Sequence, residues 1–179
     1  YATARQLVLQ GPPEIAVLQC PCRAIRENPC QPTDVCLIVG QPFVDLALEH
    51  HPGISRRISA QEALEILVAE HRRGHVHSAW FKDACLNRFF AICNCCQCCC
   101  GGIELMVRQG VPMMASSGFV AEVDPERCRG CGQGQRTCAF HAVQVKGRGG
   151  VDAKRCMGWG VCVDRCPENA LSLRPEPRR

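Results

Sequence analysis

The chain has 179 residues, a formal net charge of +4 and 17 cysteines. This length allows one ordinary domain or two small ones with a hydrophobic core, so folding does not depend on disulfides. The cysteine count is odd, many thiols are adjacent, and we expect no secretory segment at the start. These features favour metal ligation in a reducing cytoplasm over a secreted disulfide scaffold.

Hydropathy and charge restrict the class of protein further. No apolar run approaches the ~18 residues that a membrane span requires, so we expect no membrane-spanning helix. The charge of +4 counts every cysteine as neutral, whereas a 4Fe–4S site with four thiolates would carry about −2. The weakly basic charge therefore gives no indication of a nucleic-acid partner.

The first part of the chain alternates apolar segments with turns. Residues 15–18 predict a buried strand that leads into the first cysteines, and residues 35–40 predict a second strand. Residues 42–50 predict a short helix that ends before Pro52.

The clearest helix begins after Ser59. Ser59 and Glu62 have the spacing of a capping box, and an apolar stripe follows until Gly74 ends the helix. Three histidines lie at its end, and we interpret them as favourable charge placement near a helix C-terminus, not as metal ligands: His71, His75 and His77.

Further elements flank the densest run of cysteines. Cys85 precedes the run alone and is interpreted as a buried thiol. Residues 88–96 predict a strand that leads into the run, and residues 101–110 predict a short helix after it. The tail from Leu173 is expected to be frayed and solvated, with three arginines available to an acidic partner: Arg174, Arg178 and Arg179.

The strongest motif is an internal repeat in the last third of the chain. Cys128-x2-Cys131, with Cys138 further on, is matched 28 residues later by Cys156 and by Cys162-x3-Cys166-Pro167. Each segment resembles one half of a bacterial dicluster ferredoxin, whose halves carry C-x2-C-x2-C-x3-C-P. That family folds as a pseudo-symmetric pair of β-hairpins with short helices, and the resemblance covers residues 120–175.

The resemblance implies a ligand set for two clusters, because each cluster of the family takes three cysteines of one motif and the last of the other. Cluster I is expected at Cys128, Cys131 and Cys166. Cluster II is expected at Cys138, Cys156 and Cys162.

Both expected clusters lack one ligand. Gly134 stands where the first motif expects its third cysteine, and Trp159 stands where the second motif expects its second. With three thiolates a site can hold a 3Fe–4S cluster, hold a 4Fe–4S cluster with another ligand on one iron, or fail to assemble. We expect open space beside Gly134, which would admit an outside ligand, and filled space at Trp159.

Residues 92–101 read ICNCCQCCCG, which places six cysteines in eight positions: Cys93, Cys95, Cys96, Cys98, Cys99 and Cys100. In an extended chain Cys93 and Cys95 point one way, and Cys96, Cys98 and Cys100 point the other. If the run curls into a helix after Cys96, then Cys96, Cys99 and Cys100 share a stripe. Either geometry predicts that the run serves two sites or keeps some thiols free.

An earlier set of cysteines suits one four-thiolate site or half of two: Cys20, Cys22, Cys30 and Cys36. The segments CPCR…NPCQPTDVC and AICNCCQCCCG ahead of a ferredoxin tail resemble an uncharacterised group of bacterial and archaeal cysteine-rich ferredoxin-like proteins. That resemblance implies iron–sulfur clusters but no particular reaction. Zinc in a closed tetrahedral site is the alternative for these thiols, and iron–sulfur is favoured.

The sequence thus predicts an α+β protein. A cysteine-rich α/β metal-binding module is expected over residues 1–118, followed by a pseudo-symmetric ferredoxin-like domain over residues 119–179. The expected function is iron–sulfur electron transfer, alone or as a subunit of a larger oxidoreductase, with a flavoprotein or other oxidoreductase as redox partner.

Two alternatives to electron transfer stay open. One is an enzyme that uses an under-ligated cluster as a Lewis acid or redox centre, and the other is a zinc-binding structural or interaction module. The sequence contains no Ser-His-Asp order, phosphate loop or dinucleotide glycine fingerprint, which counts against the enzyme.

Overall fold

The computed structural model describes residues 1–83, 87–145 and 149–176. The chain forms two compact units, Tyr1–Cys100 and Gly101–Arg179. The boundary expected after residue 118 lies within the second unit, because helix α5 (Gly101–Gln109) is grouped with the C-terminal segments. Both units mix helices and strands, as the sequence predicted.

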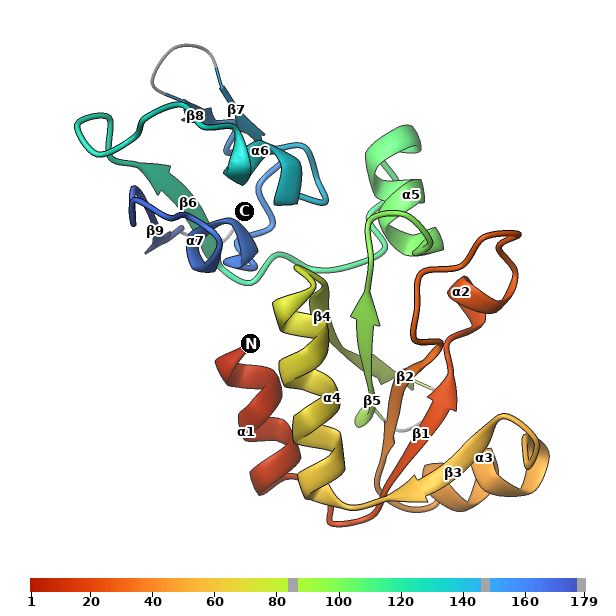
Figure 1. The fold of residues 1–179 in the computed structure, drawn as a ribbon. Helices are drawn as coiled ribbons and strands as arrows, with labels where there is room; N and C mark the ends of the chain where they lie inside the picture. The colour runs from red at the N-terminus through yellow and green to blue at the C-terminus, as the bar shows by residue number, and fades with distance from the viewer. Residues whose placement is uncertain (84–86, 146–148, 177–179) are drawn as a thin grey trace. The chain divides into compact units, whose positions relative to one another are not determined.

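The first unit is built on a sheet whose described strands are ordered β3-β1-β2-β5-β4 (Figure 1). These strands are β1 (Ile15–Gln19), β2 (Asp34–Val39), β3 (Ser55–Ile58), β4 (Val76–Lys82) and β5 (Arg88–Cys95). Neighbouring strands pair antiparallel in this sheet. The positions of β1, β2 and β5 confirm the strands predicted there.

Helices cover this sheet and complete its core. They are α1 (Ala2–Gln10), α3 (Phe43–His50) and α4 (Ala60–Arg72), while the short helix α2 (Pro21–Ala24) follows the end of β1. α1 and α4 lie side by side, and Leu67 of α4 packs with Ile15, Leu37 and Ile92 of the sheet (Figure 1). The capping box is confirmed in part, because the Ser59 hydroxyl accepts the Glu62 N–H at 3.1 Å.

Local sequence patterns do not predict α1, β3 or β4. α1 contributes only a short apolar stripe to the core, with Ala4 and Val8 buried. β3 reads SRRI, a short charged segment with a weak strand pattern. The register of β4 shifts between Trp80 and Phe81, which breaks the simple alternation that a strand prediction relies on.

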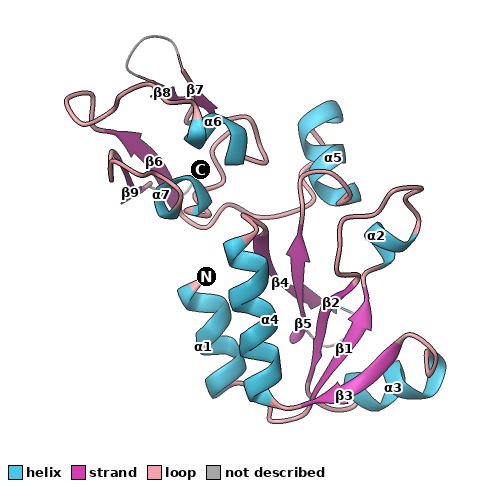
Figure 2. Cartoon of the chain, in the orientation of Figure 1, coloured by secondary structure: helices cyan, strands magenta, loops and turns pink. Residues whose placement is uncertain are grey.

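The second unit consists of short elements joined by loops (Figure 2). Beyond α5 it contains β6 (Phe119–Val123), α6 (Gln133–Thr137), β7 (Val143–Gln144), β8 (Gly150–Val151), α7 (Val161–Asp164) and β9 (Leu171–Pro175). β6 pairs with β9 and β7 pairs with β8, both antiparallel. Among the helices of the described residues, none has the length and apolar character needed to cross a bilayer.

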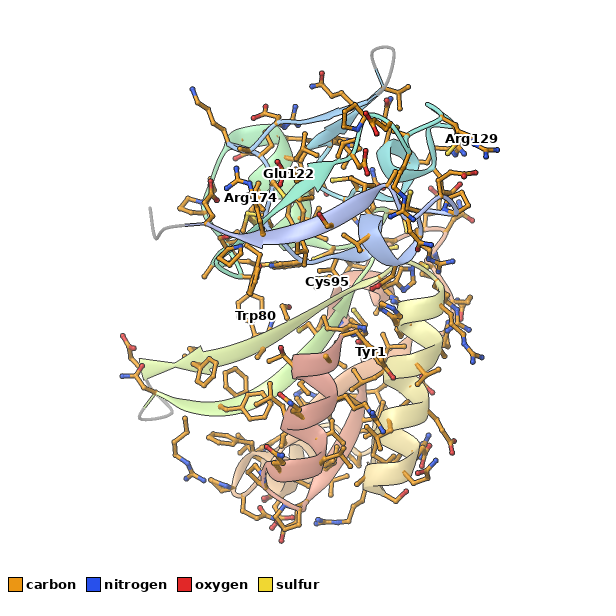
Figure 3. The ribbon with its side chains drawn as sticks, turned by 90° about the vertical axis from the view of Figure 1, so that its left-hand side faces the viewer. Tyr1, Trp80, Cys95, Glu122, Arg129 and Arg174 are labelled. Carbon is orange, nitrogen blue, oxygen red and sulfur yellow. The ribbon has the colours of Figure 1, made fainter. Side chains whose placement is uncertain are left out.

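The tail is solvated as expected, since residues 172–175 are exposed, but it is not frayed as far as Pro175. Residues 171–175 form β9, whose backbone is hydrogen-bonded to β6. Arg174 lies beside Glu122 of β6, with Nε 3.8 Å from Oε2 (Figure 3). Both side chains are largely exposed, so this pair contributes little to stability. Arg178 and Arg179 lie outside the described residues, as does Cys85.

Candidate metal centres

Three neighbouring strands bring the cysteines of the first unit to one end of its sheet. β2 is the antiparallel neighbour of β1, and β5 is the antiparallel neighbour of β2. The end of β1, the start of β2 and the end of β5 therefore lie together. Cys20 and Cys22 follow β1, Cys36 lies near the start of β2, and Cys95 ends β5 (Figures 1 and 3).

The first group of thiols, which we term the sheet-end thiols, forms a chain of side-chain hydrogen bonds. Cys36 is bonded to Cys20 and Cys93, and Cys95 is bonded to Cys93 and Cys100. The group is completed by Cys22, which is bonded to Cys20. Most of these side chains are buried or half-buried.

The hydrogen bonds within the sheet-end thiols separate their pKa values. Bonds from Cys36 and Cys95 lower the pKa of Cys93 to about 5. Bonds to Cys20 and Cys93, together with burial, raise the pKa of Cys36. These bonds favour the thiolate form of Cys93, which is the form of cysteine that binds metals.

The second group, which we term the loop thiols, consists of Cys30, Cys96, Cys98 and Cys99. The Sγ atoms of Cys30, Cys96 and Cys98 all lie within 4.8 Å of one another. The Cys99 Sγ lies 3.6 Å from the Cys98 Sγ and accepts the Cys30 N–H at 3.4 Å. The loop thiols thus join the loop after α2 to the end of β5.

The loop thiols also differ in pKa. Burial is the main cause that raises the pKa of Cys96 and of Cys98. For Cys99 burial acts in the same direction, but the Cys30 N–H and the neighbouring thiols outweigh it and lower the pKa.

The two groups divide the cysteine run differently from either expected partition. Cys93 and Cys95 share one side of β5, as alternation predicts, and Cys96 lies with the loop thiols. The Cys100 N–H then donates to the Cys96 carbonyl at 3.1 Å, which closes a single turn of chain. That turn returns Cys100 to hydrogen-bonding distance of Cys95, so Cys100 falls in the sheet-end group.

A buried ionic network lies beside the loop thiols. Arg23 of α2 is fully buried and donates to the Glu70 carboxylate, and also to the Asn94 carbonyl at 3.0 Å. Glu70 contacts His75, with Oε2 2.6 Å from Nδ1, and accepts from Arg73 at 2.9 Å. Burial opposes ionisation of Glu70, but the hydrogen bonds from His75 and Arg23 outweigh it and lower its pKa.

His75 links this network to a cysteine. Its Nε2 lies 3.7 Å from the Cys30 Sγ, while its Nδ1 faces Glu70. The interpretation of His75 as helix-end charge placement is therefore wrong, because its side chain adjoins the site. A signal was present, because Glu70 falls on the buried face of α4 with Ala63 and Leu67, where a carboxylate needs a buried partner.

In the second unit, the backbone around the cysteines repeats at a spacing of 28 residues. The Ala142 N–H donates to the Cys138 Sγ at 3.3 Å, and the Ala170 N–H donates to the Cys166 Sγ at 3.3 Å. The turn before the first cysteine of each motif is repeated as well. The Cys128 N–H donates to the Asp124 carbonyl, and the Cys156 N–H donates to the Asp152 carbonyl, both at 3.0 Å.

Glycines at the same spacing take the same unusual conformation. Gly130 and Gly158 have φ of 66° and 67°. Gly132 and Gly160 have φ of 75° and 78°, and each is the N-cap of a short helix, α6 or α7. This left-handed backbone is readily available to glycine and costly for other residues. It therefore explains why glycine occupies these four positions, which the spacing of the cysteines does not explain.

Three of the C-terminal cysteines lie close enough to interact electrostatically. Burial and the neighbouring thiols Cys138 and Cys156 raise the pKa of Cys162 to about 12. These are the three cysteines assigned to cluster II by resemblance. The assignment of ligands to either cluster stays a prediction.

The surroundings of the two missing ligands differ from the expectation in one respect. A Cβ on Gly134 would lie 3.1 Å from Leu171 Cδ1 and 3.3 Å from Val143 Cγ1. Apolar side chains thus occupy the space that was expected to be open. Trp159 packs edge-on against Phe140, with ring centroids 5.1 Å apart, which agrees with a filled site.

Comparison of the chain with protein-family models finds no match, and comparison with curated proteins finds none either. The structure supports metal binding by grouped thiols, without selecting the metal.

Proposed function

We propose that the chain is an iron–sulfur electron-transfer protein, or an electron-transfer subunit of a larger oxidoreductase, with two clusters in its second unit. The observation that carries the proposal is the repeated backbone at Cys138 and Cys166. At each of these cysteines an N–H four residues later donates to the sulfur. Backbone N–H groups directed at thiolate sulfur stabilise its charge and tune the potential of an attached cluster.

The residues present fit such clusters. Cys128, Cys131 and Cys166 would hold one, and Cys138, Cys156 and Cys162 the other. The Ala121 N–H also donates to the Cys156 Sγ at 3.4 Å, so both motifs contribute sulfurs with backbone donors. A bound cluster would supply a one-electron redox couple, and these cysteines would hold it in place.

The packing at Gly134 supports an electron carrier over an enzyme. Leu171 and Val143 line the position of the missing cysteine, so a substrate would find an apolar and occupied approach. An under-ligated iron acting as a Lewis acid requires an accessible coordination position. Electron transfer needs no such access.

The test is metal analysis and spectroscopy on the full chain, purified without oxygen. We expect iron and acid-labile sulfide together, in equal amounts for 4Fe–4S clusters and with sulfide in excess for 3Fe–4S clusters. Reduction should change the paramagnetic signals, and reoxidation should restore the starting state. Cys166→Ser and Cys138→Ser should each remove a different signal, whereas Ser172→Ala on the exposed face of β9 should remove neither.

Two results would contradict the proposal. One is a chain without iron and sulfide even after anaerobic reconstitution. The other is bound iron that cannot be reduced and reoxidised reversibly by a flavoprotein reductase or a chemical donor.

A further inference from the structure

The loop thiols have the dimensions of a site for one metal ion. Three of their sulfurs lie within 4.8 Å of one another, and the fourth lies 3.6 Å from Cys98. A tetrahedral zinc ion with Zn–S bonds of ~2.3 Å places its sulfurs ~3.8 Å apart. A cubane binds each thiolate at a different iron atom, so its thiolates must lie farther apart. Small adjustments of side chains therefore suffice for one ion, whereas a cubane would require the loop to open.

Buried positive charge beside the loop thiols matches what such a site needs. Four thiolates around one divalent ion carry a net charge of −2, which is costly in a protein interior without compensation. The fully buried guanidinium of Arg23 interacts electrostatically with Cys96 and Cys30. Arg26 adds a second guanidinium, which donates to the Cys99 carbonyl at 3.1 and 3.2 Å.

Glu70 does not cancel this charge, because it is shared. Its carboxylate accepts hydrogen bonds from both Arg23 and Arg73, so one anion faces two guanidinium groups. Of these two guanidinium groups, Arg73 is partly exposed to solvent, whereas Arg23 is buried and interacts with Cys96 and Cys30. This is the arrangement expected for cations that offset an anionic centre.

A positioning interaction completes the arrangement. Glu70 contacts His75 Nδ1 at 2.6 Å, and His75 Nε2 lies 3.7 Å from the Cys30 Sγ. Groups that hydrogen-bond to metal ligands fix the orientation of those ligands. The Cys30 N–H bond to the Cys99 Sγ orients a further thiol of the same group.

We propose that Cys30, Cys96, Cys98 and Cys99 bind one zinc ion in a closed tetrahedral site, separate from the sheet-end thiols. Arg23 and Arg26 offset its charge, and His75 positions Cys30. The ion fastens the loop after α2 to the end of β5, so that its binding free energy contributes to folding of the first unit. This site does not depend on the clusters proposed for the second unit.

Metal analysis of the full chain and of matched cysteine variants tests the site. The wild-type chain should contain one zinc ion, and Cys30→Ser and Cys98→Ser should reduce it at least tenfold. Cys36→Ser, which alters the sheet-end thiols, should retain the zinc. Iron and sulfide measured in the same samples should be unchanged by Cys98→Ser, which separates failure of this site from failure of the proposed function.

A second variant keeps the test valid if Cys98→Ser does not fold. Cys98 is exposed, and Cys98→His replaces it with another zinc ligand, so this variant should keep most of the zinc. Growth with cobalt should give the wild-type chain the absorption of tetrahedral thiolate-bound cobalt, and Cys98→Ala should abolish it. The proposal is overturned if the wild-type chain lacks zinc, if Cys36→Ser loses zinc as completely as Cys30→Ser, or if Cys98→Ser loses iron instead.

Discussion

Replacing Glu70 by Gln should strongly destabilise the first unit, because it removes the charge of a buried ion pair with Arg23. The Glu70 side chain is 1% exposed and the Arg23 side chain is 0% exposed, so the pair is shielded from water. Gln keeps the volume of Glu and one acceptor oxygen but removes the charge. Arg23 would then lose its carboxylate partner, and removing one partner of a buried ion pair costs about 3–5 kcal/mol.

The expected loss is large compared with the stability of a domain, which is about 5–15 kcal/mol. With a urea slope of about 2 kcal/mol per M, the midpoint of unfolding should fall by about 2 M. Trp80 on β4 can report this transition by fluorescence if Trp159 is first replaced by Phe (Figure 3). Both background and variant should be measured on the full chain as purified without oxygen.

Glu65→Gln is the matched control, because Glu65 lies on the same helix with an exposed side chain. Its effect should stay within about 0.5 kcal/mol, as for most surface substitutions. The double variant Arg23→Met with Glu70→Gln should lose less free energy of unfolding than the two single variants lose together. The reason is that it leaves no buried guanidinium without its carboxylate partner. If the urea midpoint of Glu70→Gln equals that of Glu65→Gln, the buried ion pair does not form.

Two further predictions concern other positions. Burial lowers the pKa of His77 to about 4, below its ordinary value of about 6.5. As the pH falls, the unfolded chain therefore binds a proton at His77 before the folded chain does. The free energy of unfolding of the first unit should decrease by about 2–3 kcal/mol between pH 7 and pH 4.5. His77→Gln should reduce this acid sensitivity, whereas an equal response in His77→Gln and the exposed control His50→Gln would refute it. A Cβ on Gly158 would lie 2.1 Å from the Phe119 carbonyl oxygen at a φ of 67°, while Gly110 has a φ of 70° with open space around it. Gly110→Ala should therefore lower the free energy of unfolding by about 1 kcal/mol, and Gly158→Ala should lower it clearly more. Thermal unfolding with Trp159 as the fluorophore measures both losses. Equal losses would show that the second unit relieves the clash.

The sequence by itself determined which residues can bind metal and several of the elements that carry them. The run of cysteines, the 28-residue repeat and the capping box at Ser59 are local patterns, and each depends on residues close together in the chain. Local hydrogen bonds and spacing are enough to specify such features. For the same reason, α4 and the strand that leads into the run were predicted at close to their observed positions.

Only the tertiary structure decided which thiols face each other. Cys30 meets Cys96 and Cys98 because the loop after β1 and the end of β5 lie at the same end of the sheet, which strand order determines and local spacing does not. One hydrogen bond that closes a turn at Cys100 is sufficient to move that thiol from one group to the other. Glu70, Arg23 and His75 come from three different segments, and their pairing follows from burial, because a charge removed from water must find its partner within the fold.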